Sequence, residues 1–411
     1  MQTGVIRHRR IGWTLLALAG CATESTQDVP SSDGDELALD ANAPAARRSQ
    51  LQKRLQDNLD ILHGDGVVGA VGRVSDGRER IDARSGVARL GGTTPVSFDT
   101  RFRMGSDTKT FVAVVMLQLV DEGKVRLSDT IDRWLPGVVA GHGNDGRQIT
   151  IRNLLQHTSG LNNYTQELLA GYTAAEYYAT RFRHYDPEQL VAIAVAQPPN
   201  FAPGTSWSYS NTNYILAGLI IKKVTGHDWS TEVNARILAP LQLTHTFDPG
   251  DQAGLPAPHA EGYSLLAWGE PMVDVTVANY TWAGAAGSLV TTTDDLTRFW
   301  RALQQGKLLS PARMAEMHDT VPATELEAAI PGIRDGLGVF WTPTRCGGYW
   351  NHLGDALGFS TRDGVNDDGS RAVVMSRNTT IDSGDAAAQD AALKLINDDL
   401  QLLADVMCVG Q

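Results

Sequence analysis

The chain has 411 residues, of which 42% are hydrophobic and 20% charged, a composition typical of a globular protein with one large core or two lobes. Its formal net charge of −12 argues against nucleic acid or an anionic membrane surface as a partner. Without the three arginines of residues 1–20 the charge would be −15, so the remainder is more acidic still.

The first 20 residues have the features of an export signal. A basic head at residues 7–10 precedes an apolar stretch, residues 11–20, that is too short to span a bilayer. This stretch ends in Leu-Ala-Gly-Cys, which resembles a bacterial lipobox, so we expect Cys21 to be lipidated and to provide the only membrane contact. Ordinary signal cleavage near Cys21 is the alternative. Either way we expect an exported protein: a cell-envelope lipoprotein, or a secreted or periplasmic protein.

A tether and then the folded domain are expected next. Residues 21–44 are rich in Ser, Asp, Ala and Pro and predict a disordered tether, with the domain occupying residues 45–411. Leucines at positions 51, 55, 59 and 62 recur at helical spacing. Residues 67–74 and 81–90, separated by Ser-Asp-Gly, predict a β-hairpin.

A buried helix with a reactive-looking start follows the hairpin. Residues 111–120 are almost all apolar, which puts Ser106 at the positive end of a buried helix and Lys109 one turn later on the same face. A serine nucleophile needs a group that takes its proton, and a desolvated lysine can do so. The spacing by itself fits a capping serine and a solvated lysine equally well.

The rest of the chain predicts a helical insertion and then a return to strands. Apolar residues recur mostly at helical spacing from about 131 to 252, whereas residues 348–352, 358–363 and 371–378 are β-rich, and a final helix covers about 386–407. The fold class is therefore α+β: an antiparallel sheet flanked by helices and built from both chain ends.

The two predicted lobes have approximate boundaries. The sheet lobe comprises about residues 45–105 and 285–411, and the mainly helical lobe about 106–284 is inserted into it. We expect the active site in the cleft between these lobes.

Two further motifs favour the catalytic interpretation of Ser106. Tyr209 and Asn211 form a Tyr-x-Asn motif, and His352 begins a His-x-Gly motif. The order Ser-x-x-Lys, Tyr-x-Asn, Lys/His-x-Gly resembles the penicillin-recognising serine hydrolases. The tyrosine version is similar to class C β-lactamases and, most closely, to secreted actinomycete-type D-alanyl-D-alanine carboxypeptidases, over about residues 51–408.

The resemblance implies a role for each motif residue. Ser106 would form an acyl-enzyme, and Lys109 and Tyr209 would handle its proton, with two nearby cations stabilising a Tyr209 phenolate. Asn211 would hydrogen-bond Lys109 and the substrate amide. His352 would orient Tyr209 and the substrate. Taken singly, Tyr209 and His352 also fit structural roles.

The substrate-binding residues implied by the resemblance lie around the third motif. Gly354 would let the substrate lie against a strand, and the oxyanion hole would use the backbone N–H groups of Ser106 and Asp355. Trp282 matches a tryptophan that lines the pocket of the related carboxypeptidases, although an ordinary core position is an equal alternative.

The third motif also departs from that family pattern. The relatives have threonine where this chain has Leu353 and Asp355, and those hydroxyls bind the free carboxylate of the substrate. Asp355 would repel a carboxylate. We therefore hypothesise an altered pocket: Asp355 binds a substrate amine, as in a D-aminopeptidase or D-amino-acid amidase, or a neutral pocket binds esters. A penicillin-binding sensor without turnover is a further alternative.

The resemblance also implies a disulfide between Cys346 and Cys408, with two buried free thiols as the alternative. The sequence contains no His-Glu-x-x-His helix and no Gly-rich phosphate loop, so we expect no metal and no cofactor. The expected partner is a peptidoglycan-type peptide or a small D-amino-acid amide or ester.

Overall fold

The computed structural model describes residues 43–169 and 172–410. The predicted signal, Cys21 and nearly all of the predicted tether lie outside these residues. Helix α1 (Ala43–Gly64) begins two residues before the predicted end of the tether, which is a small correction. Its leucines at 51, 55, 59 and 62 are at most 1% exposed, so packing of this apolar face holds the helix on the sheet.

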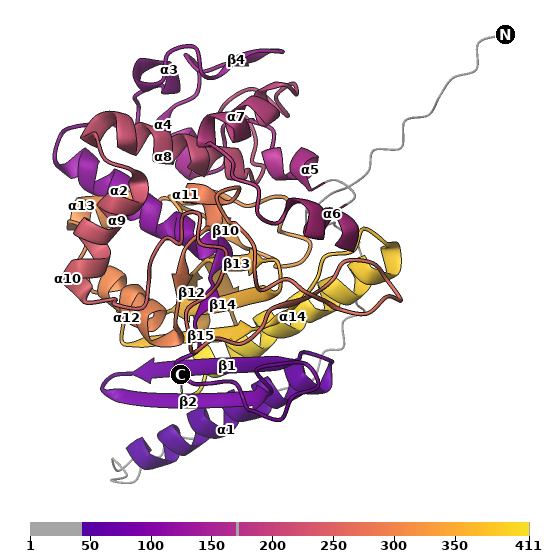
Figure 1. The fold of residues 1–411 in the computed structure, drawn as a ribbon. Coiled ribbons are helices and arrows are strands. Elements are labelled where there is room, and N and C mark those ends of the chain that lie inside the picture. Colours follow the sequence, from indigo (N-terminus) through magenta and orange to yellow (C-terminus); the bar gives the residue numbers. More distant parts are fainter. Residues whose placement is uncertain (1–42, 170–171, 411) are drawn as a thin grey trace, which may run out of the picture.

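Within the described residues, nine strands form one sheet in the lower half of Figure 1. In chain order they are β1 (Gly69–Asp76), β2 (Glu79–Gly86), β9 (Val321–Pro322), β10 (Arg334–Asp335), β11 (Phe340–Thr344), β12 (Gly347–Asn351), β13 (Leu353–Ala356), β14 (Phe359–Val365) and β15 (Arg371–Arg377). The spatial order is β2-β1-β15-β14-β12-β11-β10-β9, with β13 paired to β14. Because β1 pairs antiparallel with β15, the two chain ends share one sheet, which confirms the predicted fold class.

Successive side chains of a strand point to opposite faces of the sheet, so apolar residues of one strand contribute to the cores on both faces. On β15, Val373 and Met375 join the core that contains α1 and the C-terminal helix α14 (Ala386–Met407). Ala372 and Val374 join the opposite core, where α12 (Thr293–Gln304) packs. This period of two explains why residues 371–377 are buried throughout.

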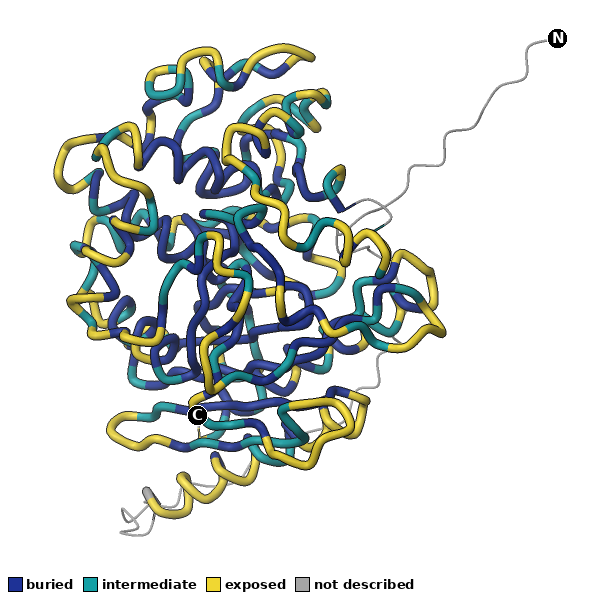
Figure 2. The backbone as a smooth tube through the Cα atoms, in the orientation of Figure 1, coloured by how far each residue is buried: buried dark blue, intermediate teal, exposed yellow. Residues whose placement is uncertain are grey.

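The second part of the molecule is helical and surrounds α2 (Thr108–Asp121). Residues 111–117 are 0% exposed, so α2 is apolar on all sides and runs through the interior, as Figure 2 shows by its dark colour. It contacts α8 (Asn211–Thr225), α9 (Trp229–Val233), α11 (Gly284–Gly287) and α13 (Pro311–Met317). The remaining helices are α3 (Ile131–Trp134), α4 (Ile151–Leu155), α5 (Tyr164–Leu168), α6 (Ala174–Thr180), α7 (Pro187–Val195) and α10 (Ala239–Leu241), with a π-helical turn at Asn234–Leu238.

Short strands also pair outside the large sheet. They are β3 (Phe102–Arg103) with β8 (Val290–Thr291), β4 (Ala140–Gly141) with β5 (Asn144–Asp145), and β6 (Tyr263–Leu265) with both β7 (Val273–Asp274) and β16 (Thr379–Ile381). The β6–β16 pair is parallel and brings a segment of the predicted helical lobe next to the C-terminal strands. The exact lobe boundaries stay a prediction.

A disulfide joins Cys346 to Cys408, with their Cα atoms 5.6 Å apart. It connects the turn between β11 and β12 to the end of α14, in agreement with the expected pairing. No helix of the described part of the chain combines the length and the apolar character needed to cross a bilayer.

Candidate active site

Ser106 lies in a single 3₁₀ turn, Gly105–Asp107, directly before α2. Gly105 has φ +59°, and a β-carbon there would overlap the peptide of Asp355 on β13. The turn is therefore pressed against β13, which places the peptides of Ser106 and Asp355 side by side. Ser106 itself stays partly exposed, so a substrate can reach its hydroxyl.

Lys109 lies under Ser106 and is 0% exposed. Its Nζ is 2.9 Å from Ser106 Oγ, 2.7 Å from Asn211 Oδ1 and 2.6 Å from the carbonyl oxygen of Ala286. Burial holds the pKa of Lys109 well below its ordinary value, and a nearby aspartate opposes this only in part. Because Nζ donates to Asn211 Oδ1 and to the Ala286 carbonyl oxygen, a neutral amine would have its lone pair free for the Ser106 hydroxyl.

Tyr209 reaches Ser106 from the loop before α8. Its phenol lies within hydrogen-bonding reach of Ser106, and Lys109 Nζ lies 4.9 Å from the ring centroid. Although part of Tyr209 is exposed, desolvation by the surrounding protein raises the pKa of its phenol. The raised pKa of Tyr209 opposes the expected phenolate, and the lowered pKa values of Lys109 and His352 weaken the two cations that would stabilise it.

The loop that carries Tyr209 is fastened by two residues outside the motifs. The His157 ring lies 4.3 Å from the Tyr209 ring between centroids, and its Nδ1 accepts a hydrogen bond from the Ser210 N–H at 3.2 Å. Glu325 Oε2 accepts from the Tyr209 N–H at 3.2 Å. These contacts fix the direction of the phenol independently of Ser106.

Asn211 is the first residue of α8 and is held at three points. Its Oδ1 accepts from Lys109, its Nδ2 lies 3.3 Å from Thr165 Oγ1, and its backbone N–H donates to Asn163 Oδ1 at 3.2 Å. The expected contact with Lys109 is thus present. The amide is oriented with its oxygen toward the lysine.

His352 lies between β12 and β13 and is 2% exposed. Its Nδ1 accepts from the Leu353 N–H at 2.9 Å, so in the neutral ring the proton belongs on Nε2. Burial, and then the charge of Lys109, lower the pKa of His352 to about 3. Its ring lies 6.5 Å from that of Tyr209 between centroids. The structure therefore offers a neutral N–H donor beside the phenol.

Close packing inside the protein requires glycine at position 354. A β-carbon at this position would overlap the carbonyl oxygen of Met104 and Oδ2 of Asp107. Protein atoms, not an open surface, occupy the space that a side chain would fill. The glycine lets β13 pack closely on the nucleophile turn, and its expected role beside the substrate stays a prediction.

Asp355 is a partly compensated carboxylate, with 44% of its side chain exposed. Its Oδ1 accepts from Ser360 Oγ at 2.7 Å and from Arg362 Nη2 at 3.1 Å. Desolvation would raise the pKa of Asp355, but Arg362 and then Arg377 outweigh it and lower that pKa. Asp355 therefore presents a partly exposed negative charge on the strand that packs against the nucleophile turn, and Arg362 neutralises part of it.

The two remaining expected substrate contacts are half-buried. Leu353 packs in the same apolar cluster as Tyr209. The carbonyl oxygen of Trp282 accepts from the Tyr164 hydroxyl at 2.6 Å, and its ring is 5.4 Å from that of Tyr280 between centroids. Trp282 precedes the α11 turn whose Ala286 carbonyl binds Lys109, so both positions border the catalytic group.

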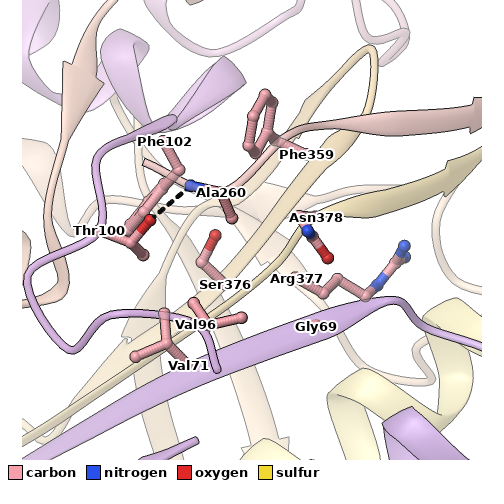
Figure 3. Close-up of a pocket in the computed structure, with 10 residues that line it drawn as sticks. All are labelled: Gly69, Val71, Val96, Thr100, Phe102, Ala260, Phe359, Ser376, Arg377 and Asn378. Carbon is pink, nitrogen blue, oxygen red and sulfur yellow. Dashed lines mark hydrogen bonds between the residues drawn. The ribbon is translucent and has the colours of Figure 1, made fainter. Parts of the chain in front are cut away.

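A small cavity elsewhere in the molecule cannot hold a substrate. Figure 3 shows it between Gly69 and Val71 of β1, Phe102 and the C-terminal strands, with Thr100 Oγ1 accepting from the Ala260 N–H at 2.9 Å. Its volume is about 10 Å³, room for roughly one water molecule. In the described part of the chain, no group of three or more His, Cys, Asp or Glu side chains is placed to hold a metal ion.

Comparison with known proteins agrees with this geometry. The family model described as beta-lactamase matches residues 52–398. The chain belongs to the beta-lactamase family. This assignment fits the sheet and helical arrangement and confirms the superfamily expected from the three motifs.

Relatives of this beta-lactamase-family chain include enzymes that act on D-amino-acid derivatives. The structure of the D-stereospecific amidohydrolase from a Streptomyces species is 39% identical, with a TM-score of 0.76, covering 83% of this chain and 98% of its own. The D-amino acid amidase of Ochrobactrum anthropi SV3 is 28% identical, with a TM-score of 0.72, covering 86% and 98%. Esterase EstB of Burkholderia gladioli is 33% identical over 217 residues, which are 50% of this chain and 54% of the esterase. The chain spans about half the length of the curated relatives it matches.

Several residues of the family site carried no motif signal in the sequence. Ala286 contributes only its backbone oxygen to Lys109, so its identity gave no indication of that contact. Glu325 and Thr165 act through single hydrogen bonds to Tyr209 and Asn211 from distant loops. Arg362 was part of a predicted strand, but only its pairing with Asp355 across β13 and β14 reveals its influence on the site.

Proposed function

We propose that this chain is a serine hydrolase that cleaves amides of small D-amino acids through an acyl-enzyme on Ser106. The observation that carries this proposal is the contact of one partly exposed hydroxyl with both a buried amine, Lys109, and a phenol, Tyr209. A serine flanked by two groups that can move its proton is the arrangement that covalent catalysis requires.

The proposed acylation starts from a neutral Lys109. The amine takes the Ser106 proton while Oγ attacks the amide carbon, and the N–H groups of Ser106 and Asp355 stabilise the oxyanion that forms. The Tyr209 phenol then protonates the leaving nitrogen as the C–N bond breaks, and the lysine returns its proton to the phenol. A water molecule releases the acyl group by the same route in reverse.

Asp355 favours a substrate with a free amine over one with a free carboxylate. Its exposed face can pair with the ammonium group of a D-amino-acid amide, whereas it would repel the terminal carboxylate of a D-Ala-D-Ala peptide. Arg362 compensates part of the charge, so we expect a half-exposed ion pair of about 1 kcal/mol, or roughly fivefold in kcat/KM. The D-stereospecific amidohydrolase and the D-amino acid amidase among the relatives support this choice.

A substrate panel tests the proposed specificity. We would compare kcat/KM for D-alanine amide, L-alanine amide, a D-Ala-D-Ala peptide and a p-nitrophenyl ester, with Ser106→Ala as the inactive control. The D-amide should exceed both the L-amide and the free-acid peptide, and Asp355→Thr should shift the preference toward the peptide. Efficient turnover of the free-acid peptide by the unchanged protein would overturn the amidase proposal in favour of a carboxypeptidase.

Ester hydrolysis is the second candidate function. The match to esterase EstB and the apolar Leu353, which packs in one cluster with Tyr209, support it. An esterase would show its highest kcat/KM on the p-nitrophenyl ester and no response to Asp355→Thr. A penicillin-binding sensor would instead keep a persistent fluorescent penicillin label and form no product from any member of the panel.

We further propose that the protein is exported and anchored by a lipid on Cys21, where a peptidoglycan-type peptide could also reach it. The disulfide between Cys346 and Cys408 supports an oxidising compartment. Fatty-acid labelling of the full chain with Cys21→Ser as control tests the anchor. The wild type should carry the fatty-acid label and be found in the membrane fraction. Wild-type protein without the label, in either the membrane or the soluble fraction, would contradict lipidation.

A further inference from the structure

Two buried carboxyl groups lie directly behind the nucleophile turn. Asp107 follows Ser106 in the chain and Asp363 lies on β14, and both residues are 0% exposed. The two carboxyl groups are within hydrogen-bonding reach of each other, and no fixed N–H or O–H donor of the described residues satisfies the oxygens of Asp107. A hydrogen bond between two carboxyl groups requires that one of them keeps its proton.

The partners of each group indicate where that proton is. Asp363 Oδ1 accepts from the His352 N–H at 3.0 Å, and its Oδ2 accepts from Trp300 Nε1 at 2.6 Å. Asp107 receives no N–H or O–H donor from the described part of the chain. The anion is therefore best placed on Asp363, and Asp107 is the acid that donates to it.

The surroundings oppose a second negative charge. Burial raises the pKa of both Asp107 and Asp363 above the usual carboxyl range. The other titratable or charged groups that face the pair are Arg362, Asp355, Lys109, Tyr209 and Tyr349. The one permanent cation among them, Arg362, lowers both pKa values in part, but it is shared with Asp355 and Asp399, and burial remains the largest cause.

The pair connects the two elements that the proposed chemistry has to align. Asp107 belongs to the turn of Ser106 and lies against Gly354 of β13, where a β-carbon would overlap its Oδ2. Asp363 holds the N–H of His352 at the start of the same strand. A change at the pair is therefore transmitted to the nucleophile and to the oxyanion donor of Asp355 together.

We propose that Asp107 is a positioning residue that must remain a neutral acid, hydrogen-bonded to the Asp363 carboxylate, for Ser106 and β13 to stay aligned. This inference rests on the proposed function, because alignment matters only if Ser106 is the nucleophile. Loss of the Asp107 proton sets two carboxylates against each other in a dry site, and the turn separates from the strand. Activity should consequently decrease at alkaline pH as the Asp107 carboxyl group loses its proton, and this decrease should precede any general unfolding.

The test is the pH profile of kcat/KM with p-nitrophenyl butyrate, which has no ionisable group. Asp107→Asn copies the neutral acid, since its amide N–H donates to Asp363, so its rate near pH 6 should stay within about threefold of wild type. The alkaline decrease seen in the wild type should be absent. In Asp363→Asn, the two N–H donors meet an amide that has only one accepting oxygen, so one donor is left unpaired. The rate of this variant should fall by more than about tenfold at every pH.

Asp382→Asn is the matched control. Desolvation raises the pKa of Asp382 to about 6, and its Oδ2 accepts from Ser264 and Thr380 rather than from the nucleophile turn. This variant should keep the wild-type profile. An alkaline decrease that persists in Asp107→Asn, or disappears in Asp382→Asn, would overturn the inference.

A second measurement needs no variant. The ionisation of a carboxyl group has almost no enthalpy, whereas that of an ammonium group or a phenol is strongly endothermic. The midpoint of the wild-type alkaline decrease should therefore hardly move with temperature, and a midpoint that falls on warming would refute the role of Asp107 even if the variants do not fold. If the wild type shows neither hydrolysis nor an adduct on Ser106, the proposed function itself has failed.

Discussion

Replacing Lys109 by methionine should remove the base while keeping most of the buried side-chain volume. The amine makes three hydrogen bonds, to Ser106 Oγ, Asn211 Oδ1 and Ala286 O. Loss of a general base costs typically about 10²–10⁴ in rate, which corresponds to about 3–5 kcal/mol in the barrier. The two carbonyl oxygens left without a donor should cost about 1–3 kcal/mol of stability each, offset in part because a desolvated amine has been removed.

The assay is kcat for p-nitrophenyl butyrate, followed by the pH profile and thermal unfolding of each variant. In the wild type, kcat/KM should rise with pH through the lowered pKa of Lys109, because only the neutral amine accepts the Ser106 proton. Lys109→Met should lack this rise. The control is Lys53→Met on the surface of α1, where the lysine is 76% exposed. A folded Lys109→Met protein within about tenfold of wild type would refute the assignment of the base.

Three further predictions concern stability and packing. Replacing Cys346 and Cys408 by serine should lower the free energy of unfolding by about 4 kcal/mol, because the disulfide closes a loop with a sequence separation of 62 residues. Urea titration measures this loss, and a loss below about 1 kcal/mol would contradict the loop-entropy argument. Gly354→Ala should reduce kcat by at least about tenfold with a lowered Tm, since the added carbon overlaps the nucleophile turn, and wild-type kinetics would rule out that contact. His318 stacks on Trp350, and burial lowers the pKa of His318 to about 4. As the pH falls from about 6.5 to 4, His318 therefore binds a proton in the unfolded chain but not in the folded chain. Stability should decrease over that range, and His318→Phe should make the decrease shallower; an unchanged slope would contradict the burial of a neutral imidazole.

The elements with long, regular patterns could be predicted from the sequence. The final helix covers residues 386–407 as expected, and β12, β14 and β15 lie within a residue or two of the predicted strands. These segments repeat one apolar period over many residues, and that period places their apolar side chains on buried faces. The short strands β9, β10 and β13 were not predicted, since two to four residues carry no recognisable period.

Within the site, the sequence predicted residues but not their electrostatic state. Lys109 and Asn211 meet as expected, because both lie at fixed positions on helices that pack together. The raised pKa of Tyr209, which opposes the expected phenolate, was not foreseen, because burial depth cannot be read from motif spacing. The partnership of Asp107 with Asp363 depends on strand pairing across 256 residues and was equally invisible.

Detection of a covalent adduct on Ser106 by intact-protein mass spectrometry tests the central claim most directly. The wild type should be incubated with a β-lactam, a D-amino-acid amide and a p-nitrophenyl ester in parallel with Ser106→Ala. We predict that at least one probe adds a single acyl mass that peptide mapping places on Ser106, and that Ser106→Ala acquires none. Undiminished hydrolysis by Ser106→Ala, or an adduct on another residue, would contradict the account.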